Sequence, residues 1–219
     1  MHSYTYRTFT SFFTENYTDS IFHEWEQKII KGQKAEEDRI EKQCKECELS
    51  GWDSEEVANQ FGDDFVRAGE VSNYMYAALI VSIWSMIEFL LKGILHTSCK
   101  VNHITYNPRL VDFRRIKCGI RKYTGIDEEE CKNYEIVNAV RILNNTFKHN
   151  NGRYKESDDR PNDKIEKSLQ QKWEIEARRQ IKYSQLPIAE IVVAINGFCK
   201  DLIAQVECTI AAKDQGSKN

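Results

Sequence analysis

The apolar run over residues 76–95 limits what this chain can fold into more than any other stretch of the sequence. About twenty residues is the length of a helix that spans a membrane. The run nevertheless contains two serines and two charged residues, Glu88 and Lys92, and charged side chains are expensive in lipid. Because these two charges stand four residues apart, they would lie together on one solvent-exposed edge of a helix. We therefore expect a buried core helix and no membrane insertion.

The composition predicts an all-α protein. Only three prolines and ten glycines interrupt 219 residues, and no alternation of Val, Ile and Thr is long enough to indicate a sheet. With 41% hydrophobic residues, the chain can bury the core of one globular domain, or of one domain with an appendage. A formal net charge of −3 excludes a protein that binds nucleic acid through a basic surface on all sides, although a local basic face is still compatible with this charge.

Start and stop residues predict two long helices in the first half of the chain. The first is expected over about residues 18–49, ended by Ser50-Gly51, with a charged and solvated second half. The second begins at residues 53–54 and runs to about residue 97, with Gly62 and Gly69 as points of interruption.

The second half of the chain is predicted to be helical as well. A loop over 98–108 is followed by a short basic segment at 109–122, and we expect helices over about 127–150 and about 187–213, where Pro187 suits the first turn. Residues 166–184 are a weaker helix candidate. In this interpretation residues 1–52 form a helical extension, 53–213 a helical bundle and 214–219 a disordered tail.

Seven cysteines occur at irregular spacings. Their odd number argues against a disulfide framework and for a reducing cytoplasm, and the N-terminus lacks the apolar core of a secretory signal. Cys44 and Cys47 form a CxxC pair, but no second pair stands at the spacing of a zinc site. Zinc and an intermolecular redox role are alternatives for this pair. We expect incidental thiols, no metal and no cofactor.

Residues 141–154 contain most of the side chains that could bind phosphate or transfer a proton. They place arginine, asparagine, lysine and histidine at the end of an amphipathic run that stops at Asn-Asn-Gly. At about 100° per residue, four apolar residues fall on one stripe of a helix: Ile136, Val140, Leu143 and Phe147. Five polar residues are expected on the opposite side: Arg141, Asn144, Asn145, Lys148 and His149. The sequence therefore predicts a coherent polar surface.

Residues 144–152, Asn-Asn-Thr-Phe-Lys-His-Asn-Asn-Gly, resemble the signature of HEPN domains. In that signature four to six residues lie between an arginine and a histidine, and a polar turn follows. Residues 83–92 are similar to the apolar helix with an embedded glutamate that precedes the motif helix in this family. The likeness covers about residues 74–213. Seven residues separate Arg141 from His149, however, and Asn144 occupies the arginine position of the common Arg-Asn-x-x-x-His form.

The resemblance implies an HEPN-like helical bundle that cleaves RNA without a metal ion. His149 would take the proton of a ribose hydroxyl or supply one to the leaving oxygen, since histidine is the side chain suited to proton transfer near neutral pH. Arg141 would hold the phosphate, and Asn144 and Asn145 would orient the phosphate or the histidine. Lys148 would add positive charge at the same place.

The resemblance also implies partners and a setting. HEPN ribonucleases usually dimerise so that two histidine–arginine pairs line one cleft, so we expect a homodimer. Such domains commonly occur in bacterial toxins and antiphage defence effectors, which makes RNA the expected substrate and an antitoxin or accessory defence protein a further partner. Arg114 and Arg115, in the basic segment, are candidates for sequence-independent contacts with RNA phosphates.

Each of these residues also has an ordinary structural explanation. A histidine or lysine at a helix end interacts favourably with the last carbonyl groups and with the helix dipole. Glu88 is more readily structural than catalytic, because a carboxylate on a buried helix needs a partner, which an arginine or lysine of the motif helix could supply. Two other functions therefore stay open: a non-catalytic HEPN-like module that binds RNA, a nucleotide or a partner protein, and a purely structural helical adaptor.

Overall fold

The computed structural model describes residues 17–106, 113–150, 152 and 181–216. These residues contain helices and no strand, which confirms the predicted all-α fold. In chain order the elements are α2 (Tyr17–Leu49), α3 (Ser54–Val101), α4 (Phe113–Thr124), the 3-10 turn η1 (Glu128–Glu130), α5 (Tyr134–Asn150), the 3-10 turn η2 (Tyr183–Gln185) and α7 (Ile188–Gly216).

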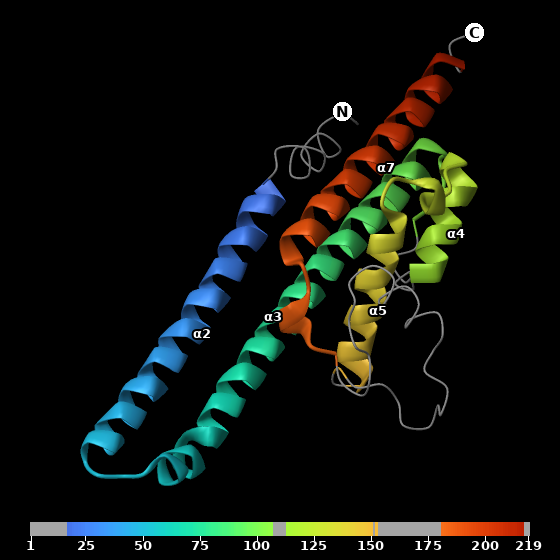
Figure 1. Cartoon of the computed structure of the whole chain (residues 1–219). Helices are drawn as coiled ribbons and strands as arrows, with labels where there is room; N and C mark the ends of the chain where they lie inside the picture. The colour runs from blue at the N-terminus through green and yellow to red at the C-terminus, as the bar shows by residue number, and fades with distance from the viewer. Residues whose placement is uncertain (1–16, 107–112, 151, 153–180, 217–219) are drawn as a thin grey trace.

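α2 and α3 form a long antiparallel hairpin whose closed end projects beyond the other helices (Figure 1). Gly51 makes the turn with a left-handed φ of 96°, which strains any residue with a side chain. Asp53 then caps α3, because its Oδ1 accepts the backbone N–H groups of Glu55 and Glu56, both at 2.9 Å. The Glu56 carboxylate accepts the Asp53 N–H at 3.0 Å in return. This capping box explains why α3 starts where the sequence predicted.

We expect Asp53→Ala to lower the free energy of unfolding by about 1 kcal/mol, because two backbone N–H groups at the start of α3 lose their acceptor. Urea unfolding followed by circular dichroism measures the difference. Asp63→Ala is the matched control, since Asp63 is an exposed aspartate of the same helix away from its cap. The control should stay within about 0.5 kcal/mol of wild type. Equal losses in the two variants would contradict the capping role.

α3 is the centre of the core, and α2, α4, α5, η2 and α7 all contact it. The prediction that Gly62 and Gly69 interrupt it is wrong: both lie in one continuous helix, on open surface where nothing comes within 4 Å of an added Cβ. The predicted loop from residue 98 is also wrong, because α3 continues to Val101. Ser98 and Cys99 are still buried there, so core packing extends the helix past the predicted end.

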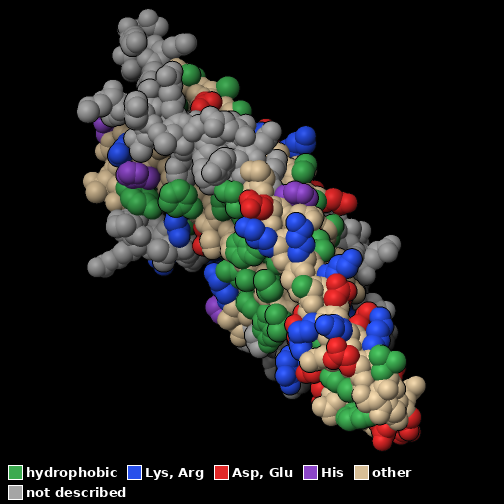
Figure 2. Space-filling model, turned by 90° about the vertical axis from the view of Figure 1, so that its left-hand side faces the viewer, with side chains coloured by type: hydrophobic (Ala, Val, Ile, Leu, Met, Phe, Trp, Pro, Cys, Tyr) green, Lys and Arg blue, Asp and Glu red, His purple; other side chains and the backbone are tan. Residues whose placement is uncertain are grey.

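By length and composition α3 could also cross a membrane. Its most apolar window of 18 residues has a mean hydropathy of 1.9, and half of that window is buried inside the bundle. The other half reaches the surface. Figure 2 shows one face of the molecule, on which hydrophobic side chains gather along the middle beside rows of lysine and arginine side chains.

α2 packs against both α3 and α7 and is therefore part of the bundle at its N-terminal half. Phe22 and Ile29 enter the core, whereas Ile40 is the one buried residue among residues 31–48, as the predicted solvated second half requires. α7 follows Pro187 as predicted but reaches Gly216, three residues into the expected disordered tail. The helix candidate at 166–184 lies outside the described residues up to 180, and its last residues begin η2.

Candidate functional site

The motif helix starts later than the sequence predicts. Residues 128–130 form η1, and Asp127 caps it by accepting the Glu129 N–H at 3.2 Å. The chain then breaks at Asn133, which has a left-handed φ of 62° and donates its side-chain amide to the Ala194 carbonyl of α7 at 3.0 Å. α5 begins only at Tyr134. The predicted continuous helix from 127–128 is therefore wrong, because the contact with α7 holds the break in place.

The predicted apolar stripe of α5 is confirmed. Three of its residues are buried: Ile136, Val140 and Leu143. Phe147 packs edge-on against Tyr74 of α3 and Tyr183 of η2, with ring centroids 6.0 Å and 5.7 Å away. Tyr183 also donates its hydroxyl to the Leu143 carbonyl at 2.9 Å. The C-terminal end of α5 is thus fixed between α3 and η2.

Three of the predicted site residues share one row on the outer side of α5. Arg141, Asn145 and His149 stand four residues apart, so their side chains follow one another along the helix surface. We call these three residues the α5 ridge. Arg141 and Asn145 are half-buried, whereas His149 is exposed, as is the neighbouring Lys148. The reactive side chains therefore become more accessible towards the end of the helix.

The predicted surface position of Asn144 is wrong. Its side chain is 2% exposed, because it lies only about 40° around the helix from Val140 and so borders the apolar stripe. Its amide donates to the Asn145 Oδ1 at 3.1 Å. Within the described part of the chain its own Oδ1 accepts no hydrogen bond. Asn144 can therefore fix the orientation of Asn145, but it does not face solvent beside His149.

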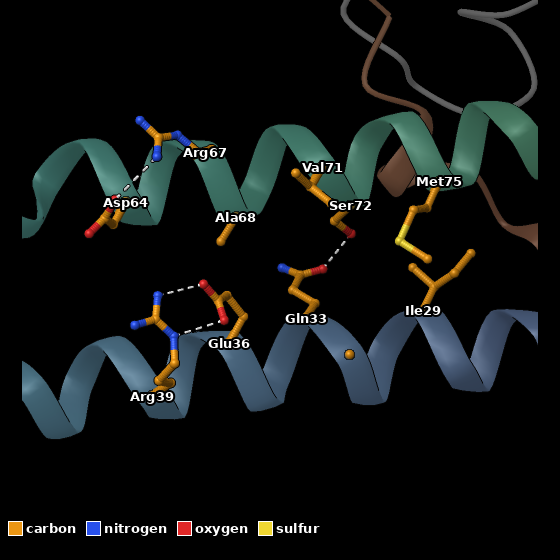
Figure 3. A pocket seen from close by; sticks show the side chains of 11 residues that line it. Ile29, Gln33, Glu36, Arg39, Asp64, Arg67, Ala68, Val71, Ser72 and Met75 are labelled. Carbon is orange, nitrogen blue, oxygen red and sulfur yellow. Dashed lines mark hydrogen bonds and ion pairs between the residues drawn. The ribbon is translucent and has the colours of Figure 1, made fainter.

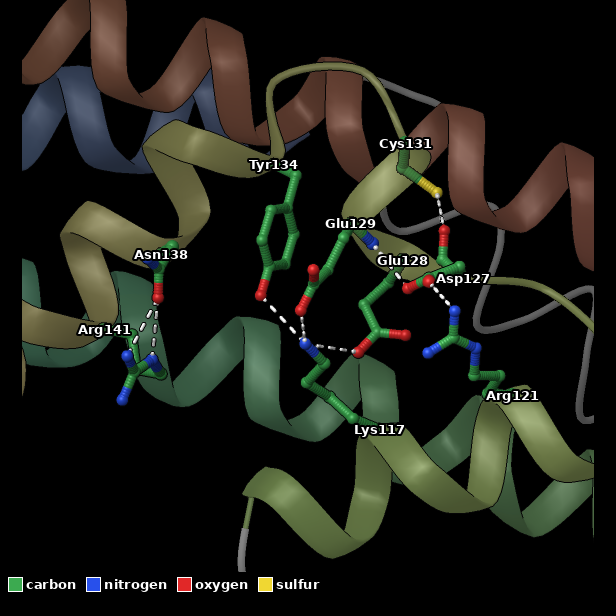
Figure 4. Close-up of polar contacts among 9 residues, drawn as sticks. All are labelled: Lys117, Arg121, Asp127, Glu128, Glu129, Cys131, Tyr134, Asn138 and Arg141. Carbon is green, nitrogen blue, oxygen red and sulfur yellow. Dashed lines mark hydrogen bonds and ion pairs between the residues drawn. The ribbon is translucent and has the colours of Figure 1, made fainter. Parts of the chain in front are cut away.

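Arg141 does not approach His149 of the same chain. Its guanidinium donates twice to the Asn138 Oδ1, at 3.1 Å and 2.9 Å (Figure 4). The guanidinium also lies 5.5 Å from the centre of the Phe113 ring of α4. These contacts point the side chain towards the start of α5. Its Cα lies eight positions, or about 12 Å of helix, before that of His149. One chain therefore does not bring the predicted arginine–histidine pair together.

A cluster of charges that the sequence did not predict joins α4 to η1 and α5. Lys117 of α4 makes ion pairs with Glu129 and, at 3.3 Å, with Glu128, and it donates to the Tyr134 hydroxyl at 3.0 Å (Figure 4). We call these four residues the Lys117 cluster. Glu128 is 1% exposed, and neither of its carboxylate oxygens accepts a hydrogen bond from a described residue. The ammonium of Lys117 is therefore the main group that compensates the buried negative charge of Glu128.

The electrostatics of this cluster keep Lys117 charged. Burial of the ammonium lowers its pKa, but the hydrogen bonds to Glu129 and Tyr134 and the charge of Glu128 outweigh that effect and raise the pKa of Lys117 above its usual range. Arg121 of α4 makes a further ion pair with Asp127. Two cations of the predicted basic segment thus hold the segment before α5 and are not left for a ligand.

Arg114 and Arg115 remain on the exposed side of α4. They follow Phe113, the residue that Arg141 contacts, so they lie at the Arg141 end of the α5 ridge and not at the His149 end. Glu88 is half-buried on α3, and within the described part of the chain no ion pair joins it to an arginine or lysine of α5. Its predicted supporting partner in α5 is therefore not found there.

A pocket of about 400 Å³ opens elsewhere, between α2 and α3 (Figure 3). None of the predicted site residues lines it. Ser72 donates to the Gln33 Oε1 at 2.6 Å in its middle, and its two arginines each pair with an acid on their own helix. Among the described residues, no group of three or more His, Cys, Asp or Glu side chains is placed to hold a metal ion, and Cys44 and Cys47 are free thiols.

Comparison with known proteins adds no relative. No protein-family model, no curated protein and no solved structure matches this chain.

Proposed function

We propose that this protein binds RNA along the α5 ridge and cleaves it without a metal ion, with His149 as the proton-transfer group. One observation carries the proposal: His149 is exposed in the last turn of α5, at the end of a row that also holds Asn145 and Arg141. Histidine is suited to proton transfer near neutral pH, and the place of His149 before a polar turn matches the HEPN resemblance.

The chemistry would proceed by transesterification. His149 accepts the proton of a ribose 2′-hydroxyl and the 2′-oxygen attacks phosphorus. The bond to the 5′-oxygen breaks as that oxygen takes up a proton from water. Asn145, one turn before His149, can donate to a phosphate oxygen. Lys148 points about 100° away around the helix, so it would bind a flanking phosphate and not the scissile one.

The stabilisation of the phosphorane is expected to come from a second copy. Within one chain Arg141 lies about 12 Å along α5 from His149, so only the Arg141 of an opposed copy can come beside it. A homodimer that opposes two α5 ridges would supply two histidines and two arginines to one cleft. By the resemblance, we further propose that the protein acts in the cytoplasm as a toxin or antiphage effector, controlled by an antitoxin or an accessory protein.

A second candidate function is RNA binding without cleavage. The position of Arg141 favours it, because a guanidinium that stacks on Phe113 and bonds to Asn138 stabilises the fold whether or not RNA is present. The burial of Asn144 favours it as well, since Asn144, like Arg141, then does not face solvent beside His149.

One experiment separates these functions. The purified protein is incubated with total RNA in EDTA beside His149→Ala and Arg141→Ala, and RNA binding is measured in parallel by filter retention. We expect wild type to cleave in EDTA and both variants to lose cleavage. RNA binding without cleavage would support the second candidate, and the absence of both would favour a structural adaptor.

A further inference from the structure

The outward face of α3 carries a regular uncharged seam. Its six residues alternate spacings of four and three: Val71, Met75, Ala78, Ser82, Ser85 and Phe89. This 3.5-residue repeat is the pattern of a helix that packs along another helix. The three large side chains are well exposed, at 53% for Val71, 41% for Met75 and 64% for Phe89. We call these six residues the α3 seam.

The seam can be buried without leaving polar groups unsatisfied. Ser82 donates its hydroxyl to the Ala78 carbonyl at 3.0 Å, and Ser85 donates to the Val81 carbonyl at 2.8 Å. Both hydroxyl protons are therefore already used inside α3, so covering these serines forfeits no donor. The small side chains in the middle also let a second helix come close, with the large side chains at the two ends.

We propose that the α3 seam pairs with the α3 seam of a second copy, antiparallel, about a two-fold axis near residue 80. In that register the residue numbers of two positions that face each other sum to 160. Val71 then meets Phe89 of the second copy, Met75 meets Ser85, and Ala78 meets Ser82. Every member of the seam has a partner within the seam, and each contact occurs twice about the axis, as an isologous interface requires.

The pocket between α2 and α3 supports this register independently. In knobs-into-holes packing, a side chain aligned with Val71 enters a hole between Ala68, Val71, Ser72 and Met75. All four of these residues line the pocket, and Ile29 of α2 closes its apolar end (Figure 3). The knob for this hole is Phe89 of the second copy. A volume of about 400 Å³ can hold its ring, because a cavity of roughly 150 Å³ already holds benzene.

The charges that continue the seam select the antiparallel direction. The start of α3 is acidic and includes Asp64, one repeat before Val71, whereas its end is basic and includes Lys92 and His96, which follow Phe89 at the same spacing. Antiparallel pairing aligns Asp64 with His96 of the second copy and brings Lys92 within one turn. Parallel pairing would set like charges against each other, which disfavours association.

The register has a consequence for the α5 ridge. Tyr74, at the rim of the seam, contacts Phe147 near the end of α5. In an antiparallel pair, the two Tyr74 side chains fall on the same side of the helix pair and about 18 Å apart along it. The two copies of His149 would then flank the two-fold axis on one side. This consequence rests on the proposed function, whereas the pairing itself does not.

The molar mass of the full-length protein tests the pairing. Light scattering on a size-exclusion column, over a series up to about 100 μM, should give twice the 25.6 kDa of one chain. Val71→Arg should raise the dissociation constant at least about tenfold, because it places a charge in the hole. Val66→Arg is the matched control: Val66 is 63% exposed on the same helix but off the seam, so this variant should remain dimeric.

A charge exchange tests the register. Phe89→Glu alone should also weaken the dimer, and the double variant Val71→Arg/Phe89→Glu should restore it, because each arginine then meets a glutamate of the second copy. Circular dichroism confirms that each variant is folded. Three results of these measurements would overturn the proposal: a monomeric wild type, a dimer untouched by Val71→Arg, or a double variant that stays monomeric.

A seam that binds something other than a second copy would overturn it as well. Dimerisation only after deletion of residues 1–16 would indicate that this segment binds the seam. Flotation of the wild type, but not of Val71→Arg, with phosphatidylcholine vesicles would indicate a lipid surface.

The molar mass is measured without RNA, so a failure of the proposed pairing can be told apart from a failure of the proposed RNA cleavage.

Discussion

Lys117→Ala is expected to lower the free energy of unfolding by about 3 kcal/mol. The substitution leaves Glu128, which is 1% exposed, as a buried carboxylate without its cation. Breaking a buried ion pair from one side typically costs about 3–5 kcal/mol. The lower end applies because one-fifth of the Lys117 side chain is still exposed, so water already screens part of the interaction. Urea unfolding followed by circular dichroism measures the loss.

Two further variants separate the ion pair from the rest of the helix. Arg115→Ala removes an exposed cation from α4 and should change the free energy of unfolding by no more than about 0.5 kcal/mol. The double variant Lys117→Met/Glu128→Leu should recover most of the loss, because no uncompensated charge is then buried. If Lys117→Ala were no less stable than Arg115→Ala, the Lys117 cluster would not hold the segment before α5.

The pH dependence of the same contribution follows from the raised pKa of Lys117. The unfolded chain has a lysine pKa of about 10.4, and the folded value lies above it. The stabilisation by the charged ammonium is therefore fully present below that pH and is lost as the pH rises through the folded pKa. Neutral and mildly alkaline buffers should leave the stability difference between Lys117→Ala and wild type unchanged.

His149→Ala should lower the rate of RNA cleavage by about 10²–10⁴-fold while leaving the fold intact. General acid–base catalysis by a positioned histidine contributes a factor of that size. Because His149 is exposed in the last turn of α5, its removal opens no cavity and leaves no buried partner behind. The rate is measured on a short labelled RNA in EDTA, and urea unfolding of the variant checks that stability is retained.

His23→Ala is the matched control, since His23 is an exposed histidine on α2, away from α5. It should cleave RNA at the wild-type rate. Equal loss of activity in the two histidine variants would indicate a general effect, and equal retention would remove His149 from the chemistry. The RNA-binding candidate would then be the better description.

Local patterns were enough to predict most of the fold. The apolar run at 76–95 identified the part of α3 that lies at the core, and the start predicted at residues 53–54 coincides with the capping box of Asp53 and Glu56. Both signals are local, because a capping box and an apolar face are set by residues within a few turns. Ile136, Val140 and Leu143 are buried for the same reason: helical periodicity alone decides which side of α5 faces the core.

Contacts between distant segments explain what the sequence missed. Helical counting gives the direction in which Arg141 leaves α5, but not its choice of Asn138 and Phe113 over His149. The break at Asn133 depends on a carbonyl of α7, 61 residues away. The pairing of the basic segment with the acidic run at 127–130 could have been noticed, since four consecutive acidic residues follow only four residues after the basic segment. It would have predicted the Lys117 cluster.

The end groups of RNA fragments formed in EDTA test the central proposal most directly. A reaction that begins with proton removal from the 2′-hydroxyl leaves a 2′,3′-cyclic phosphate on one fragment and a 5′-hydroxyl on the other. We expect wild type to produce these ends without a metal ion, and His149→Ala, purified in the same way, to produce none. Intact RNA, ends formed equally by His149→Ala, or cleavage that requires Mg²⁺ would contradict the role of His149.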